Sequence, residues 1–388
     1  MHLLYFAPVN LNRPNAVQTH TLGLLQGFSR QGARVAAVLT RPDRPLPVWP
    51  GVTCHYTGPF RGGRRHLPRE VVVSSLILWR LCRRQQFDAI YARDMDVFIG
   101  PRLCSRLFHL PLFLEIDDTP VEGEYPTLVR RLVANNLACD YRQASGLIVP
   151  SVPRSKILQE RFHVPAAKIH VILNGTEEIA GPSAAPAAAK ARLGLPADSF
   201  CLGYVGTVND RYDFATMLQA TARCRTVLPN LRFILTGDGP CRPAVEQQVQ
   251  QLGLSDLVLL TGFVQPDRFP ELLPAVDIGL MLLTAAALAE HGPIHTKLAT
   301  YGLYGLAVIT AADSLAGYPD GLRPGLVLTP PEDPERLAAL IISLAQQPQR
   351  RQAIAAALQT FVRQKLTWTA VAGEILAVMA QAAKAPPP

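Results

Sequence analysis

Short apolar runs alternate with helical patterns along almost the whole chain, and this alternation restricts the fold more than any other sequence feature. In the first such unit, residues 3–7 form a predicted strand, residues 19–30 a helix and residues 35–39 the next strand. Gly32 follows the helix, where a glycine can cap its end. A repeated strand–helix order predicts parallel sheets that are covered by helices.

A segment of small residues divides this alternation into two halves. Residues 180–190 read AGPSAAPAAAK, which is typical of a linker. Further strands are predicted at 89–92, 112–116, 146–149, 201–205, 231–235, 258–260 and 276–281, and further helices at 214–225, 244–252 and 266–273. We therefore predict two Rossmann-like α/β domains, residues 1–180 and 191–365, facing a central cleft. The carboxyl ends of both sheets should face that cleft, because open parallel sheets bind ligands there.

Composition and cysteine spacing indicate a globular protein of a reducing compartment. Apolar residues make up 48% of the chain and charged residues 18%. None of the seven cysteines forms a Cys-x-x-Cys pair, so neither a zinc cluster nor a redox dithiol is indicated. The apolar run at residues 1–7 is too short for a signal peptide, and no later run is long enough to cross a bilayer. We expect a cytoplasmic protein that does not span a membrane.

The net charge of +8 favours anionic partners such as nucleotide phosphates or acidic lipid surfaces. No nucleic-acid-binding motif is present, so we expect no nucleic-acid partner. One segment is crowded with arginines, namely Arg61, Arg64, Arg65, Arg69, Arg80, Arg83 and Arg84. Val72, Leu76 and Trp79 lie between them at helical spacing. One alternative is that the arginines contact the surface of an anionic membrane. The other is that the helix packs on its own sheet, with its basic ends in water. We expect the apolar side chains to pack on the sheet and the arginines to contact lipid.

Eight stretches resemble, in order and spacing, those of GT-B glycosyltransferases of family 4, also called group 1. They are NAVQTHTLGLLQGFSRQGARVAAV (15–38), GLIVPS (146–151), KIHVILNGTE (168–177), CLGYVGTVNDRYDF (201–214), LRFILTGDGP (231–240), VLLTGFV (258–264), AVDIGLMLL (275–283) and GPIHTKLATYG (292–302). The resemblance implies a metal-independent retaining enzyme without a cofactor. Such an enzyme moves a sugar from a UDP- or GDP-sugar to a glycan or lipid-linked acceptor, as in envelope or exopolysaccharide synthesis. It also implies that segment 366–388, with a helix starting near Trp368, returns to the first domain.

The resemblance places the donor site in the second domain, at Gly206, Thr207, Arg211, Gly262, Phe263, Val264, Lys297, Leu298, Ala299 and Thr300. Lys297 would lie beside the diphosphate, with the amides of Leu298 and Ala299 pointing at it from a helix start. Gly206 would let the backbone approach the phosphates, and residues 262–264 would read the base through main-chain groups. The structural alternatives are a solvated Lys297, a tight turn at Gly206 and a core position for Phe263.

In the first domain, the candidate acids lie at the end of the predicted strand 112–116, and the candidate histidine lies near the start of the predicted helix 19–30. His20 and Asp117 are expected to act directly in the reaction, as is Lys297 of the second domain. Asn15, Glu115 and Asp118 are expected to contact the acceptor. Three carboxylates so close together are unfavourable unless they are solvated or paired. A plain acidic loop and a structural histidine are the alternatives.

Several positions depart from the family pattern. Thr207 and Tyr212 stand where the family has an arginine and a lysine on the diphosphate. Gly292 and Thr300 stand where it has two glutamates, and Asp117 stands where it has a histidine. The sequence therefore leaves two hypotheses open: an active transferase, or a catalytically degenerate protein that binds nucleotide sugars. An NAD-dependent enzyme is a weaker third, because no G-x-G-x-x-G follows the first strand.

Overall fold

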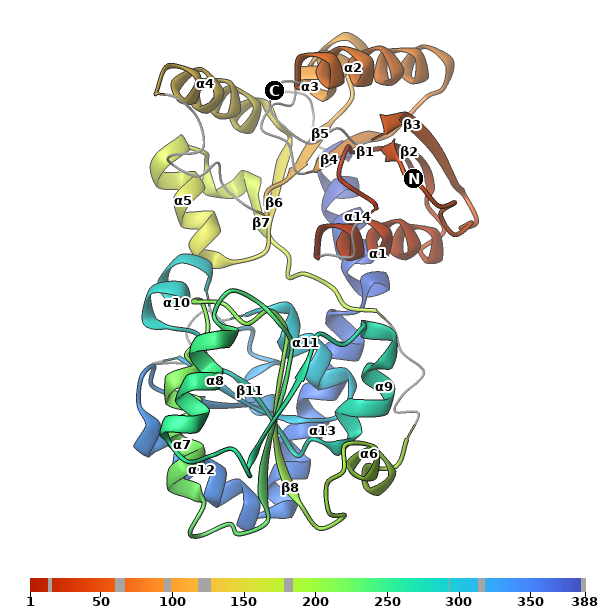
Figure 1. Cartoon of the computed structure of the whole chain (residues 1–388). Helices are drawn as coiled ribbons and strands as arrows, with labels where there is room; N and C mark the ends of the chain where they lie inside the picture. Colours follow the sequence, from red (N-terminus) through yellow and green to blue (C-terminus); the bar gives the residue numbers. More distant parts are fainter. Residues whose placement is uncertain are drawn as a thin grey trace. The chain divides into compact units, whose positions relative to one another are not determined.

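A computed structural model describes residues 1–12, 16–59, 67–93, 99–117, 127–177, 184–292, 294–312 and 318–384. The chain forms two compact units: unit 1 comprises Met1–Gly175 and Trp368–Pro388, and unit 2 comprises Thr176–Thr367. Each unit is a parallel sheet with helices around it (Figure 1). The prediction of two Rossmann-like α/β units is confirmed, while the cleft between them stays a prediction.

The sheet of unit 1 has the strand order β3-β2-β1-β4-β5-β6-β7, and every strand pairing in it is parallel. Its strands are β1 (His2–Ala7), β2 (Arg34–Arg41), β3 (Val52–Pro59), β4 (Ala89–Arg93), β5 (Leu112–Glu115), β6 (Gly146–Val149) and β7 (Ile169–Val171). The sequence did not predict β3 and β7. Both are edge strands whose side chains are mostly half-buried, so neither has a buried apolar run.

The helices of unit 1 cover both faces of this sheet. They are α1 (Ala16–Arg30), α2 (Leu67–Arg84), α3 (Ile99–Phe108), α4 (Thr127–Gln143), α5 (Val152–Phe162) and α14 (Trp368–Lys384). Because side chains alternate along a strand, β1 contributes Leu4 and Phe6 to one core and Leu3 and Tyr5 to the other.

The last helix, α14, returns to unit 1 as predicted and packs against α1 (Figure 1). Trp368 fills a space that three glycines leave open: a Cβ atom at Gly23, Gly27 or Gly175 would overlap it. The Trp368 ring also meets the ring of His20 edge to face, with centroids 4.7 Å apart. The first turn of α14 therefore lies directly against the helix that positions His20.

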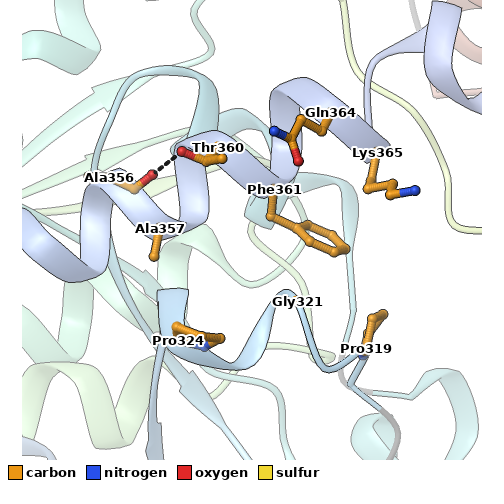
Figure 2. Close-up of a pocket in the computed structure, with 9 residues that line it drawn as sticks. All are labelled: Pro319, Gly321, Pro324, Ala356, Ala357, Thr360, Phe361, Gln364 and Lys365. Carbon is orange, nitrogen blue, oxygen red and sulfur yellow. Dashed lines mark hydrogen bonds between the residues drawn. The ribbon is translucent and has the colours of Figure 1, made fainter.

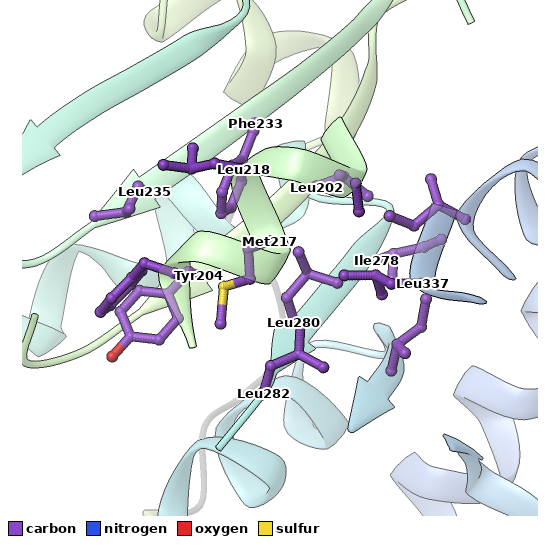
Figure 3. Packing of buried hydrophobic residues seen from close by; sticks show 14 of the residues in the cluster. Leu202, Tyr204, Met217, Leu218, Phe233, Leu235, Ile278, Leu280, Leu282 and Leu337 are labelled. Atoms are coloured by element: carbon purple, nitrogen blue, oxygen red, sulfur yellow. The ribbon is translucent and has the colours of Figure 1, made fainter. Parts of the chain in front are cut away.

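Unit 2 has a six-stranded sheet with the order β10-β9-β8-β11-β12-β13. Its strands are β8 (Phe200–Val205), β9 (Leu231–Thr236), β10 (Val258–Gly262), β11 (Ile278–Met281), β12 (Ala307–Ala311) and β13 (Leu326–Thr329). Its helices are α6 (Pro186–Arg192), α7 (Phe214–Cys224), α8 (Arg242–Gln251), α9 (Phe269–Leu272), α10 (Ala285–His291), α11 (Thr296–Leu303), α12 (Pro334–Gln346) and α13 (Pro348–Lys365). Figure 3 shows apolar side chains from β8, β9 and β11 packed against α7 and α12.

Two local expectations for unit 2 need correction. Part of the expected linker is the helix α6, which unit 2 holds through a hydrogen bond from Lys190 Nζ to the Ser199 carbonyl (2.6 Å). The single helix expected at 266–273 is instead a 3₁₀ turn at Pro266–Arg268, the four-residue α9 and another 3₁₀ turn at Leu273–Ala275. Pro270 and Pro274 lack the amide hydrogens that a continuous helix needs.

The orientation of α2 also differs from the expectation. Val72, Leu76 and Trp79, which were expected to pack on the sheet, are exposed. The helix buries Ser74, Leu78 and Leu81 instead. Of the arginines named with this helix, Arg61, Arg64 and Arg65 lie outside the described residues. Across the part of the chain that the structure describes, no helix combines the length and apolar character needed to cross a membrane.

Candidate active site

In unit 2, three glycine turns gather at the carboxyl edge of the sheet. Gly206 follows β8 and Gly237 follows β9, while Gly262 ends β10. The Gly206 N–H donates to the Thr236 carbonyl and the Gly237 N–H donates to the Gly262 carbonyl, both at 2.9 Å. The strand order reverses between β8 and β11, so this edge includes the switch point where open α/β sheets bind ligands.

These turns require glycine because the backbones pass very close to one another. Gly206 and Gly237 have φ values of 137° and 149°, in a region that other residues rarely adopt. A Cβ atom on Gly237 would overlap the Gly206 carbonyl oxygen. A Cβ atom on Gly206 would come within 2.6 Å of Nζ of Lys297. Gly206 therefore both forms a tight turn and lies beside the ammonium of Lys297, so the structural and the functional interpretation of this glycine are compatible.

Lys297 lies in the first turn of α11 and is enclosed rather than solvated. Its Nζ is 3.7 Å from the ring centroid of Tyr212 and 5.0 Å from that of Tyr204, which are cation–π distances. Burial, together with the positive charge of Arg211, lowers the pKa of Lys297 to about 7. The interpretation of Lys297 as a solvated lysine is therefore wrong, and its ammonium is in a place where an anion would stabilise its charge.

Tyr301 fixes the position of α11, and the sequence analysis did not identify it. Its hydroxyl accepts the Val205 N–H (3.0 Å) and donates to the Leu280 carbonyl (3.2 Å). The ring also occupies the space beside Gly279, where a Cβ atom would meet it at 2.7 Å. Tyr301 thus ties the helix of Lys297 to β8 and β11. A tyrosine four residues after a helix-start lysine was the available signal.

The neighbours of Lys297 on α11 have fewer free groups than expected. The Leu298 N–H donates to the His295 carbonyl at 2.9 Å, which contradicts the expectation that this amide points at a phosphate. Ala299 is buried beside it. The Thr300 hydroxyl donates to the Thr296 carbonyl (3.3 Å), so it too is used within the helix.

The remaining donor candidates surround the glycine turns. Phe263 is exposed, which contradicts a core position and leaves its ring available at the end of β10. The Gly262 carbonyl is already bonded to Gly237, and Val264 is half-buried. Thr207 is exposed, and its carbonyl accepts the Tyr204 hydroxyl (2.6 Å).

Unit 1 has a buried ionic cluster at the carboxyl ends of β4 and β5. Arg93 ends β4, Glu115 ends β5, Asp117 follows two residues later, and His20 comes from α1. Nε2 of His20 is 2.7 Å from Oε1 of Glu115, and Nδ1 of His20 is 4.0 Å from Oδ2 of Asp117. Nε of Arg93 is 3.2 Å from Oε2 of Glu115, and its Nη2 pairs with Oδ2 of Asp117.

Arg93 is the central group of this cluster, and the sequence analysis missed it. Its Nη1 donates to Oγ1 of Thr21 (3.2 Å) and to the Val17 carbonyl (3.3 Å), so the side chain is fixed against α1. Burial alone would raise the pKa of Asp117, but the charges of Arg93 and His20 outweigh it and hold that pKa below its usual value. An arginine at the end of an otherwise apolar strand, AIYAR, was the available signal.

The cluster changes the interpretation of the residues predicted for unit 1. His20 and Glu115 are buried and paired with each other, so Glu115 orients His20, and its burial argues against the predicted acceptor contact. The alternative of a plain acidic loop does not hold for Glu115 or Asp117. Asn15 and Asp118 lie outside the described residues. Ligand atoms of His20, Glu115 and Asp117 lie within 4.8 Å of one another and could hold a metal ion, but Arg93 already pairs with both carboxylates.

A separate surface pocket of unit 2 lies between α13 and the turn that precedes β13 (Figure 2). Its lining is mostly apolar, with Gln364 and Lys365 at one end, and consists of Pro319, Gly321, Pro324, Ala356, Ala357, Thr360, Phe361, Gln364 and Lys365. The lining includes neither the glycine turns nor Lys297. The described residues that line the pocket include no acid, histidine or cysteine, so they offer little for catalysis.

Solved structures share this fold over nearly the whole chain. Anabaena HepE in complex with UDP aligns with a TM-score of 0.72 and 19% identity, covering 98% of this chain and 100% of that one. HepE in complex with UDP-glucose aligns with a TM-score of 0.70 and 18% identity over the same shares. The fold is thus that of the GT-B glycosyltransferases.

Curated relatives match parts of the chain. A D-inositol 3-phosphate glycosyltransferase of Thermobispora bispora is 27% identical over 277 residues, which are 67% of this chain and 61% of that protein. A 2-deoxystreptamine N-acetyl-D-glucosaminyltransferase of Streptomyces fradiae is 31% identical over 191 residues, 47% of this chain and 45% of that protein. The chain spans about half the length of the curated relatives it matches.

Two sequence-family models match consecutive parts of the chain. Residues 15–175 match the glycosyl transferase 4-like domain, and residues 199–347 match the glycosyl transferases group 1 domain. The matches fall on unit 1 and unit 2, respectively. Together with the shared fold, they show that this chain belongs to the group 1 glycosyltransferases.

Proposed function

We propose that the protein is a retaining glycosyltransferase whose nucleotide-sugar donor binds at the glycine turns of unit 2. The observation that supports this most is the ammonium of Lys297, which lies against Gly206 and within cation–π distance of two tyrosine rings at the switch point of the sheet. A half-buried cation beside a backbone that a ligand can approach closely suits the diphosphate of a nucleotide sugar. The exposed ring of Phe263 and Val264 lie at the same edge, where the base would bind.

The proposed reaction breaks the bond between the sugar C1 and the diphosphate oxygen. Negative charge then develops on the departing diphosphate, where Lys297 stabilises it. The acceptor hydroxyl attacks C1 from the face that the leaving group departs from, and its proton passes to a phosphate oxygen. Lys297 supplies the positive charge at the leaving group, and Arg93 pairs with both carboxylates of unit 1, so we propose that no metal ion or other cofactor takes part.

For the acceptor we propose a glycan or a lipid-linked sugar, in a cytoplasmic step of envelope or exopolysaccharide assembly. Uridine is the first base to test, since the HepE structures contain UDP and UDP-glucose. In unit 1, Asp117 is more exposed than His20 and is the better candidate for contact with the acceptor or sugar. His20 is held by Glu115 and lies near Asp117, and in this proposal it contacts the substrate as well.

Thermal melting against UDP, GDP, ADP, CMP and dTDP sugars, with NAD as control, tests the donor site. A ligand that binds only the folded state at about 100 times its Kd stabilises the protein by about 2.7 kcal/mol. We expect one nucleotide family to raise the melting temperature, and Lys297→Met to remove the shift. Lys365→Met, at an exposed lysine of the same unit, is the matched control. No shift with any nucleotide sugar would refute the proposed donor site.

A protein that binds nucleotide sugars without turnover is the second candidate. The observations that favour it are the neutral side chains of Tyr212 and Thr300 at positions where the family has charged residues, and the hydroxyl of Thr300 bonded within its own helix. Release of the free nucleotide, with and without added sugar acceptors, separates the candidates. Binding without any release of nucleotide would favour this candidate over the transferase.

A further inference from the structure

Helix α2 turns an apolar stripe toward solvent. Val72, Leu76 and Trp79 are 58%, 48% and 38% exposed, and their spacing places them on one side of the helix. The opposite side of α2 holds the buried Ser74, Leu78 and Leu81, so the helix packs on unit 1 without using the apolar stripe.

The neighbouring helix α3 adds to this exposed apolar surface. Leu103 and Leu107, one turn apart, are 46% and 63% exposed. The two helices lie side by side (Figure 1), and they are in such close contact that a Cβ atom on Gly100 would meet Oγ of Ser75 at 2.7 Å. The name α2–α3 surface is used below for these five apolar residues, Val72, Leu76, Trp79, Leu103 and Leu107, together with Arg69, Arg80, Arg83, Arg84 and Arg106. Exposed apolar side chains on two helices in contact make this part of unit 1 a candidate interaction site.

Arginines surround these apolar side chains. Arg69, Arg80, Arg83 and Arg84 of α2 and Arg106 of α3 are all exposed. None of these five arginines forms an ion pair with another residue in the part of the chain that the structure describes. The guanidinium of Arg83 lies 4.9 Å from the ring centroid of Trp79, so charge and aromatic surface are presented together. The surface combines positive charge with apolar side chains, on helices that contribute only Glu70 as an acid.

We propose that the α2–α3 surface binds the surface of an anionic lipid bilayer, with the apolar side chains inserted at the headgroup level. A helix with one apolar stripe, flanking arginines and a tryptophan is suited to lie in the membrane interface. The arginines would meet lipid phosphates while their aliphatic stems cover apolar surface. This inference does not rest on the proposed donor site, which lies in unit 2.

The charge pattern favours a bilayer over a protein or nucleic-acid partner. Single-stranded nucleic acid is bound by aromatic rings on which bases stack, and the α2–α3 surface has one aromatic ring among aliphatic side chains. An acidic protein could pair with the arginines. It would also need apolar side chains that fit the exposed apolar residues of both helices. A fluid bilayer adapts to both stripes without such matching.

Flotation of the full-length protein with vesicles tests the proposal. One set of vesicles contains phosphatidylcholine alone and the other contains phosphatidylcholine with phosphatidylglycerol. We expect binding to the anionic set, and the variant Arg80→Gln/Arg83→Gln/Arg84→Gln should weaken it by about a hundredfold, as expected for three basic residues near an anionic surface. The matched control, Arg336→Gln/Arg350→Gln/Arg363→Gln, removes the same charge from exposed positions of unit 2 and should bind like the unaltered protein.

A second variant, Leu76→Ser/Trp79→Ser, separates insertion from simple charge attraction. We expect it to weaken binding while all five arginines remain, and to leave the melting temperature nearly unchanged because both side chains are exposed. Equal binding to both vesicle sets would overturn the proposal. An equal loss of vesicle binding in the unit 2 control would also overturn it. So would a protein that does not bind vesicles but binds a nucleic acid or heparin, if the α2 variants abolish that binding.

Discussion

Raising the pH should weaken the binding of a nucleotide sugar, because Lys297 loses its charge. In the free protein, burial and the nearby charge of Arg211 lower the pKa of Lys297 to about 7. A diphosphate beside the ammonium favours the charged form and therefore raises that pKa again. Both phosphates of a nucleotide sugar are esterified and keep their charges through the neutral range, so among these groups the lysine is the one that titrates.

The size of the effect follows from the protonated fraction of the free protein. An amine with a pKa of about 7 is about nine-tenths protonated at about pH 6 and about one-tenth protonated at about pH 8. If only the protonated lysine accepts the diphosphate, the apparent Kd increases in proportion to the loss of that form. We therefore expect donor binding to be about tenfold weaker at about pH 8 than at about pH 6.

Isothermal titration calorimetry in two buffers of different ionisation enthalpy measures both the affinity and the protons exchanged. At about pH 8 we expect the uptake of nearly one proton for each nucleotide sugar bound. Lys297→Arg keeps its charge at both pH values and should flatten the pH profile. An affinity that is the same at both pH values, with no proton uptake, would refute the reasoning, as would the same slope in Lys297→Met.

Three further predictions concern stability, and denaturation with urea measures each. Gly237→Ala should cost about 3 kcal/mol or more, since its Cβ would overlap backbone, whereas Gly32→Ala, with nothing within 4 Å, should cost only about 1 kcal/mol; equal losses would contradict the steric argument. Arg93→Met should cost about 3–5 kcal/mol by leaving its buried carboxylates unpaired, and a change near zero would show that the cluster is not stabilised in this way. The depressed pKa of Asp117 contributes stability above its unfolded value of 3.8 that is lost as the pH falls through the lower folded value, so Asp117→Asn should lose less stability in acid, and parallel acid curves would count against this assignment.

The sequence allowed β1, β2, β4, β5, β6 and β8 to β11 to be predicted, together with the helices α1, α7 and α8 and the glycine turns. The apolar runs at β1, β4, β5 and β8 have the length and burial of central strands, and such runs are visible in the sequence itself. The helix start expected at Lys297 also agrees with the structure, which in addition brings Gly206 beside this lysine. The edge strands β3 and β7 escaped prediction because half-buried strands have no distinctive apolar pattern. The mostly buried strands β12 and β13 were not predicted either.

The environment of each candidate side chain could not be predicted in the same way. The sequence predicted that Val72, Leu76 and Trp79 share one side of a helix, but not whether that side faces the sheet or solvent. It identified Glu115 and Asp117 as adjacent acids, but gave no indication that Arg93 lies between them. The pKa of Lys297 depends on rings and charges brought to it by other strands and turns.

By itself, then, the sequence determined the two parallel α/β units, their glycine turns and the residue types at the candidate sites. These features depend on local periodicity and on backbone geometry, which a short stretch of chain specifies. Only the tertiary structure decided that Lys297 is enclosed by Tyr204 and Tyr212, that Arg93 holds the acids of unit 1, and that the apolar stripe of α2 faces solvent. Burial and pairing depend on groups that are distant in the chain, because the free energy of a charge or an apolar side chain is set by its neighbours in space.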